Sequence, residues 1–207
     1  MKIASRVLKY TALALVFSII GFLVVRIMMA DYYPKMMKEL YPTETLIAAY
    51  EAEPTIEIRR QKLAISYDNA DFALFMADHQ YYCPAAGELQ IAVRYNESTL
   101  REVQKDFGLS SVPDADPALF DFTLYDDNGN RYPLALQRSA GWAMYRYYKL
   151  GFTGIDFGEQ TNWIRLDIYY KDAVDYEKEP YASILLYNKE LAKDDSVYPL
   201  REGDLKR

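Results

Sequence analysis

The segment Leu89-Gln-Ile-Ala-Val-Arg-Tyr95 carries the clearest secondary-structure signal in the chain. Apolar side chains at positions 89, 91, 93 and 95 alternate with Gln90, Ala92 and Arg94. Because successive side chains of a strand point to opposite faces of a sheet, this alternation predicts a strand with one apolar face. That face must pack against another layer, so the segment favours a layered β fold.

A short helix is predicted directly after this strand. Thr99-Leu-Arg-Glu102 fits a capping box, in which the Thr99 hydroxyl and the Glu102 carboxylate each satisfy a backbone donor. Gly108 can take the left-handed conformation that ends many helices. We therefore expect a helix over residues 100–107.

Strand patterns continue toward the C-terminus. Asn128-Gly129 lies between two alternating apolar segments and predicts a hairpin, because both residues tolerate positive φ angles. Further strands are indicated by β-branched and aromatic residues at 143–152, 155–157, 163–170 and 181–188.

On the N-terminal side, Ile56 and Ile58 alternate with polar residues and predict a first strand from Thr55. A second strand, apolar on both faces, is predicted at 72–77, followed by a loop over 78–88. Residues 55–190 are thus predicted to form a mainly all-β domain, an antiparallel immunoglobulin-like β-sandwich with one short helix.

The segments on either side of this domain are predicted to be simpler. Residues 31–54 read as a stalk or a short docking helix, because Pro34 and Pro42 interrupt any continuous helix and Thr43 can cap a short one. Residues 191–207 read as a polar C-terminal tail.

An uncharged stretch of sixteen residues runs from Tyr10 to Val25. A bilayer core needs about 20 helical residues. Because the Arg26 stem can lie in hydrocarbon while its guanidinium reaches the headgroups, the apolar helix can continue to Ala30. We predict a single transmembrane signal anchor over residues 10–30.

The residues before this stretch indicate its orientation. Lys2, Arg6 and Lys9 precede it without any acid, which favours a cytoplasmic segment 1–9 and an extracytoplasmic domain in the cell envelope. The alternative is a secreted protein released by signal cleavage after Ala30. Met28 then occupies the third position back, where a small residue is preferred.

The amino-acid composition argues against several kinds of partner and cross-link. Residues 31–207 hold 20 basic and 30 acidic residues, a net charge of −10, which argues against nucleic acid or anionic lipid surfaces as partners. Cys83 is the only cysteine, so no internal disulfide can form. We expect no cofactor.

Twenty tyrosines suit half-buried strands, and aromatic residues also serve contact surfaces. Outward members of the late strands are candidates for such a surface: Trp142, Tyr145, Tyr147 and Tyr169. The sequence therefore predicts a non-catalytic binding or structural module, whose partner is an envelope protein or a cell-wall component.

The competing hypothesis is an envelope enzyme. His79 and Cys83 lie four residues apart and suggest a thiolate–imidazole pair or two metal ligands, although two ligands are too few without further carboxylates. Three acids, Asp114, Asp116 and Asp121, suggest general acid–base chemistry such as glycoside hydrolysis.

No metal site is predicted. Asp126, Asn128 and Asn130 match the first, third and fifth positions of a calcium loop. Arg131 replaces the required glycine and Gln137 replaces the final glutamate.

The plan of an N-terminal anchor, a β domain and one cysteine resembles that of sortases, the transpeptidases of Gram-positive surfaces. Sortases place the catalytic cysteine at the end of a late strand, in a Thr-Leu-x-Thr-Cys motif. Here Gln80-Tyr81-Tyr82 precedes an early Cys83, so the resemblance is one of overall plan.

Overall fold

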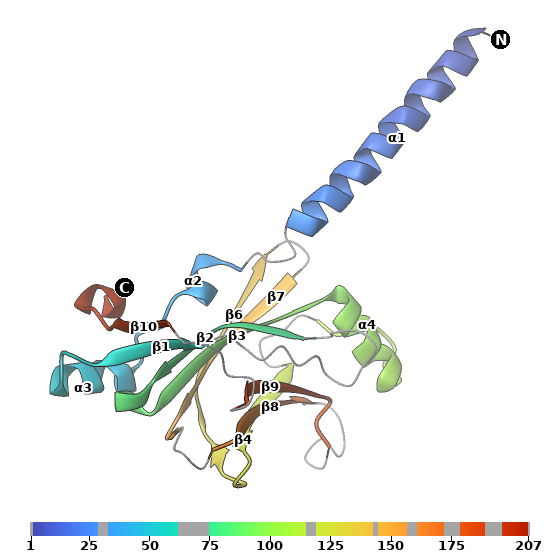
Figure 1. Ribbon diagram of the computed structural model, residues 1–207. Coiled ribbons are helices and arrows are strands. Elements are labelled where there is room, and N and C mark those ends of the chain that lie inside the picture. The colour runs from blue at the N-terminus through green and yellow to red at the C-terminus, as the bar shows by residue number, and fades with distance from the viewer. Residues whose placement is uncertain are drawn as a thin grey trace. The chain divides into compact units, whose positions relative to one another are not determined.

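The computed structural model describes residues 2–28, 33–61, 75–114, 119–142, 145–156, 161–171, 179–188 and 196–206. The chain divides into two compact units, Met1–Tyr33 and Pro34–Arg207. The first holds one long helix and the second holds the β domain (Figure 1).

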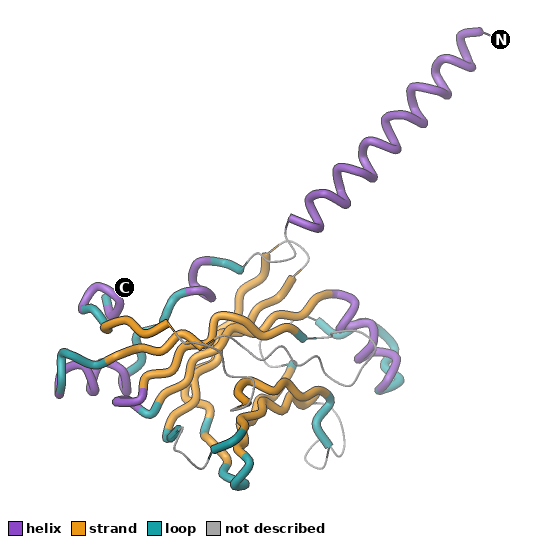
Figure 2. The backbone as a smooth tube through the Cα atoms, viewed as in Figure 1, coloured by secondary structure: helices purple, strands orange, loops and turns teal. Residues whose placement is uncertain are grey.

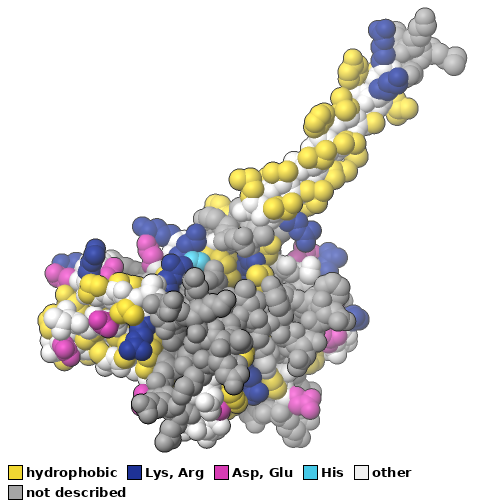
Figure 3. Space-filling model, viewed as in Figure 1, with side chains coloured by type: hydrophobic (Ala, Val, Ile, Leu, Met, Phe, Trp, Pro, Cys, Tyr) yellow, Lys and Arg dark blue, Asp and Glu magenta, His cyan; other side chains and the backbone are white. Residues whose placement is uncertain are grey.

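The first unit is dominated by α1 (Lys2–Met28), an uninterrupted helix. Its segment Arg6–Met28 is long and apolar enough to cross a membrane by length and composition, and none of it is buried. Apolar side chains cover its surface in Figure 3. The predicted N-terminal apolar helix is confirmed, and it is compatible with both the anchor and the signal peptide.

The β domain consists of two antiparallel sheets packed against each other (Figure 2). The larger contains, in spatial order, β10 (Ser196–Pro199), β1 (Glu57–Gln61), β2 (Met76–Cys83), β3 (Glu88–Asn96), β7 (Tyr145–Thr153) and β6 (Leu134–Trp142). The smaller contains β5 (Arg131–Tyr132), β4 (Phe120–Asp126), β8 (Trp163–Tyr170) and β9 (Ala182–Asn188). The predicted antiparallel two-sheet packing is confirmed, whereas the immunoglobulin-like strand order stays a prediction.

The main core lies between the two sheets. It is formed by alternate residues of the central strands, including Leu89, Ile91 and Val93 of β3, Leu150 and Phe152 of β7, Phe122 and Leu124 of β4, and Leu166 and Ile168 of β8. In this core the centre of the Phe120 ring lies 4.9 Å from the ring centre of Phe75 and 5.3 Å from that of Tyr95, and both pairs meet edge to face. Such contacts add to the area burial that holds the layers together.

A second, smaller core lies on the opposite face of the larger sheet. Two helices, α2 (Lys35–Lys38) and α3 (Glu44–Ala52), precede β1. Leu46 of α3 is buried in this cluster with Ile58, Cys83 and Leu200. From Pro34 onward the predicted stalk or docking segment belongs to the same compact unit as the sheets. Likewise, residues 196–199 of the predicted tail pair with β1.

The predicted loop over 78–88 is wrong. β2 runs to Cys83, and only a short 3₁₀ turn, Pro84–Ala86, separates it from β3. A bulge between Asp78 and Tyr81 interrupts the pairing of β2 with β3, and His79 there has a φ of 52°. Because a bulge shifts the two-residue period, the strand has no visible alternation in the sequence.

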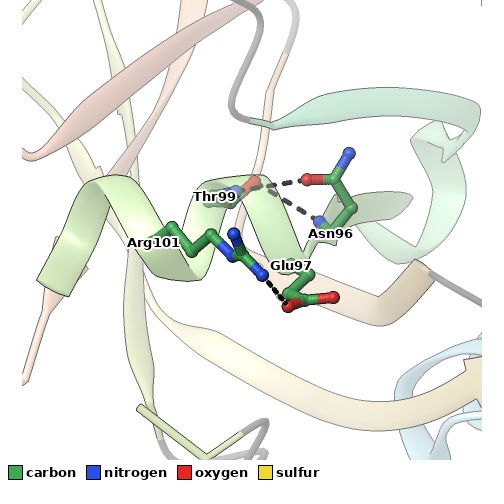
Figure 4. Close-up of polar contacts among 4 residues, drawn as sticks. All are labelled: Asn96, Glu97, Thr99 and Arg101. Atoms are coloured by element: carbon green, nitrogen blue, oxygen red, sulfur yellow. Dashed lines mark hydrogen bonds and ion pairs between the residues drawn. The ribbon is translucent and has the colours of Figure 1, made fainter. Parts of the chain in front are cut away.

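Among the described residues of the segment 55–190 there is one α-helix, α4 (Glu97–Asp106), and it begins earlier than predicted. Asn96, not Thr99, is its cap (Figure 4). The Asn96 Oδ1 accepts from the Thr99 N–H at 3.1 Å, and the Thr99 hydroxyl accepts from the Asn96 N–H at 3.3 Å. Thr99 thus occupies the third helical position of the capping box, a role that the sequence pattern had assigned to Glu102. Gly108 has the expected positive φ, 62°.

Replacing Asn96 with Ala is expected to lower the free energy of unfolding by about 1 kcal/mol, because the Thr99 N–H loses its acceptor at the helix start. Denaturant unfolding measures this change. Asn96→Asp keeps the acceptor and is expected to differ from the wild type by only a few tenths of a kcal/mol. Equal losses in both variants would mean that the cap does not hold α4.

The predicted hairpin is present between β4 and β5. Gly129 has a φ of 80°, and Asp126 closes the turn. The carboxylate of Asp126 accepts from the backbone N–H groups of Asn128 at 3.0 Å and Asn130 at 2.8 Å, and from the Tyr132 hydroxyl at 2.7 Å. The polar residues that resemble a calcium loop therefore satisfy the turn itself.

Replacing Asp126 with Asn is expected to cost about 2 kcal/mol and to weaken the acid sensitivity of the fold. Burial alone would raise the pKa of Asp126, but the hydrogen bonds from Asn130, Tyr132 and the backbone outweigh burial and lower that pKa. A carboxyl with a lowered pKa stabilises the fold above its unfolded pKa, about 3.9, and loses that contribution as the pH falls through its folded pKa.

Urea unfolding between pH 7 and pH 3 tests this prediction. The wild type is expected to lose more stability on acidification than Asp126→Asn, with the exposed Asp114→Asn as the control. Parallel pH profiles for all three proteins would contradict it.

Candidate contact surface

Three of the four predicted aromatic contact residues share one face of the larger sheet. Trp142 of β6 is paired with Tyr145 of β7, and Tyr147 lies two residues further along β7. Paired residues, and residues two apart on a strand, point to the same face. Tyr169 lies on β8 in the other sheet, so it is separate from this group.

This face is the one opposite the main core, and residues 34–43 bind to it. We call these residues the connector and the sheet face beneath them the connector face. The Lys149 ammonium lies 3.4 Å from the Met37 carbonyl oxygen, and the Tyr81 hydroxyl donates to the Lys38 carbonyl. Contacts from β2 and β7 therefore hold the connector.

A buried polar cluster fixes the connector most firmly at Tyr41. The Gln90 side chain accepts from the Tyr41 N–H and donates to the Tyr41 carbonyl, both at 2.7 Å. The same amide donates to Glu88 at 2.8 Å, and the Thr43 hydroxyl donates to Glu88 at 2.5 Å. Gln90 and Glu88 are both 1% exposed. Burial raises the pKa of Glu88, while these hydrogen bonds and the charge of Lys149 oppose the rise.

Cations pair with aromatic rings across the connector face. The guanidinium carbons of Arg94 and Arg138 lie 4.7 Å from the ring centres of Tyr145 and Tyr41, respectively. The Lys149 ammonium lies 5.0 Å from the ring centre of Tyr81. These distances are within the range of favourable cation–π contacts. The face is thus aromatic and cationic in a domain that is acidic as a whole.

The described residues of this face on β6 and β7 differ in their exposure. Trp142 is 50% exposed, whereas Tyr147 is fully buried. Tyr145 is partly exposed and Arg138 is exposed. We call Arg138, Trp142 and Tyr145 the tryptophan end. The remaining candidate, Tyr169, is 8% exposed, and burial followed by the charge of Asp167 raises its pKa to about 12.

The geometry gives little support to a thiol site. Cys83 is 1% exposed, and burial raises the pKa of its thiol, so the reactive thiolate is disfavoured. His79 lies in the β2 bulge, four residues before Cys83. At about 3.3 Å per residue, four strand residues span roughly 13 Å, whereas a nucleophile and its base must lie within hydrogen-bond distance.

The structure describes two of the three acidic candidates. Asp121 lies on β4 and forms an ion pair with Lys171 at 3.1 Å. Asp114 is exposed, and Asp116 lies outside the described residues. Among the residues that the structure describes, no group of three or more His, Cys, Asp or Glu side chains is arranged to hold a metal ion.

Comparison of the chain with protein-family models, with curated proteins and with solved structures gives no match. Function is therefore inferred from the chain's own chemistry. Trp142 and Tyr145 were predicted from the sequence, whereas Arg138 and the Gln90–Tyr41 contact were not. The available signal was the polar set on the second face of β3, which includes Glu88 and Gln90.

Proposed function

We propose that this chain is a single-pass membrane protein with a cytoplasmic N-terminus. Its β domain is a non-catalytic binding or structural module on the extracytoplasmic side of the cell envelope. The observation that carries the proposal is the exposure of α1, whose large apolar side chains are 48–75% exposed from Val7 to Met28. Each buried Å² of apolar surface is worth about 25 cal/mol, so such a helix favours hydrocarbon over water.

The binding part of the proposal is supported by the tryptophan end. An exposed tryptophan with an arginine on the same face of its strand is typical of protein contact surfaces, because both side chains offer large contact area and strong anchoring. We also propose that the strands follow an immunoglobulin-like order, since every described strand pair is antiparallel and the two sheets enclose one core.

Fractionation of cells that express the full chain tests this function. Under the proposal, the chain stays in the membrane pellet after alkaline extraction and mass spectrometry gives the intact 24.0 kDa polypeptide. A soluble polypeptide that begins after Ala30 would show instead that the apolar segment is a cleaved signal. An intact chain recovered free in the cytosol would contradict both alternatives.

A further inference from the structure

We infer that the tryptophan end, Arg138, Trp142 and Tyr145, contacts the phospholipid headgroups of the bilayer that holds α1. This inference rests on the proposed function and names the partner of its contact surface. The partner is the lipid surface itself, recognised by aromatic rings at headgroup depth and by bases that bind phosphate.

The length of the chain supports this choice of partner. Pro34 follows Met28 by six residues, and a fully extended link of six residues spans about 20 Å. The connector that starts at Pro34 is bonded to the connector face through Tyr41 and Met37. A helix that ends at the bilayer surface near Met28 therefore holds Pro34, where the connector starts, within about 20 Å of that surface.

The side chains on this side of the domain suit that location. Tryptophan and tyrosine are enriched where membranes meet water, because their rings are apolar at one end and polar at the other. Trp142 and Tyr145 have this character and are accessible. Exposed bases on the same face and on α2 are Arg60, Arg138 and Lys35, of which Lys35 is paired with the exposed Glu39 at 3.5 Å.

The acidity of the domain does not oppose this contact in a tethered protein. A net charge of −10 over residues 31–207 weakens long-range attraction to an anionic surface. A domain linked to α1 needs no such attraction to reach the bilayer, and its bases on the connector face lie where phosphates would meet them. The local charge, rather than the net charge, then decides which side faces the lipid.

The two tryptophans allow a direct test, because α1 contains none and the second, Trp163, lies on β8 in the other sheet. The full chain is reconstituted into phosphatidylcholine vesicles with or without bromine on the acyl chains near the headgroups. Trp163→Phe leaves Trp142 as the reporter, and Trp142→Phe leaves Trp163. Both variants keep an aromatic ring, and thermal unfolding checks that they fold.

Bromine is expected to reduce Trp142 emission about two-fold and to leave Trp163 emission unchanged, since only Trp142 sits at headgroup depth. Protein that floats with the vesicles but shows no quenching of Trp142, or equal quenching of both tryptophans, would overturn this inference while the anchored module stands. Protein that does not float with vesicles would overturn the proposed function and this inference together.

Discussion

Replacing Ile19 and Ile20 together with Asp is expected to remove the chain from the membrane fraction. Both side chains are about half exposed in the middle of α1. An acidic residue at the centre of a transmembrane helix costs about 3 kcal/mol, so two cost roughly 6 kcal/mol, or about four orders of magnitude in partitioning. Alkaline extraction followed by immunoblotting of pellet and supernatant measures the change.

The matched control replaces the same two residues with Leu, which keeps the helix apolar. This variant is expected to fractionate with the wild type. If the double-Asp variant also stayed in the pellet, the β domain rather than α1 would hold the chain at the membrane. That result would remove the basis for an anchor.

Replacing Gln90 with Ala is expected to lower the free energy of unfolding by about 2–4 kcal/mol. The substitution removes both hydrogen bonds between the Gln90 amide and the Tyr41 backbone, and each such bond to a part-buried group contributes about 1–2 kcal/mol. For a domain of this size, thermal unfolding is then expected to shift down by about 5–10 °C. Limited proteolysis is expected to cut the released connector faster.

Gln137→Ala serves as the control, because Gln137 is an exposed residue on β6 and surface substitutions usually change stability by less than about 0.5 kcal/mol. Equal melting temperatures for the two variants would mean that the connector is held by other contacts. The orientation of the domain at the membrane would then need another explanation.

Local patterns predicted the elements that depend on neighbouring residues. β3, β8 and the hairpin at Gly129 follow directly from alternation and turn chemistry. α4 was located within a few residues, although Asn96 replaced Thr99 as its cap because both residues can accept the first free N–H groups. Most of β2 was predicted as a loop because its bulge shifts the two-residue period.

Features that depend on distant parts of the chain were not predictable. The partner of Gln90 is Tyr41, which lies 49 residues earlier, and no local pattern connects them. The alternation of apolar and polar residues also does not indicate whether another part of the chain packs on the second face of a strand. For that reason Tyr147 and Trp142, which share a face, seemed equivalent in the sequence, yet one is fully buried and the other is half exposed.

Labelling of single cysteines from outside the cytoplasmic membrane tests the proposed membrane topology most directly. Cys83→Ser removes the buried natural thiol, and Ser139→Cys or Ser5→Cys then adds one cysteine on exposed β6 or in the basic N-terminal segment. A membrane-impermeant maleimide is predicted to label position 139 in cells with an intact cytoplasmic membrane, and position 5 only after permeabilisation. Labelling of position 5 but not 139 in the intact cells would contradict the proposed topology.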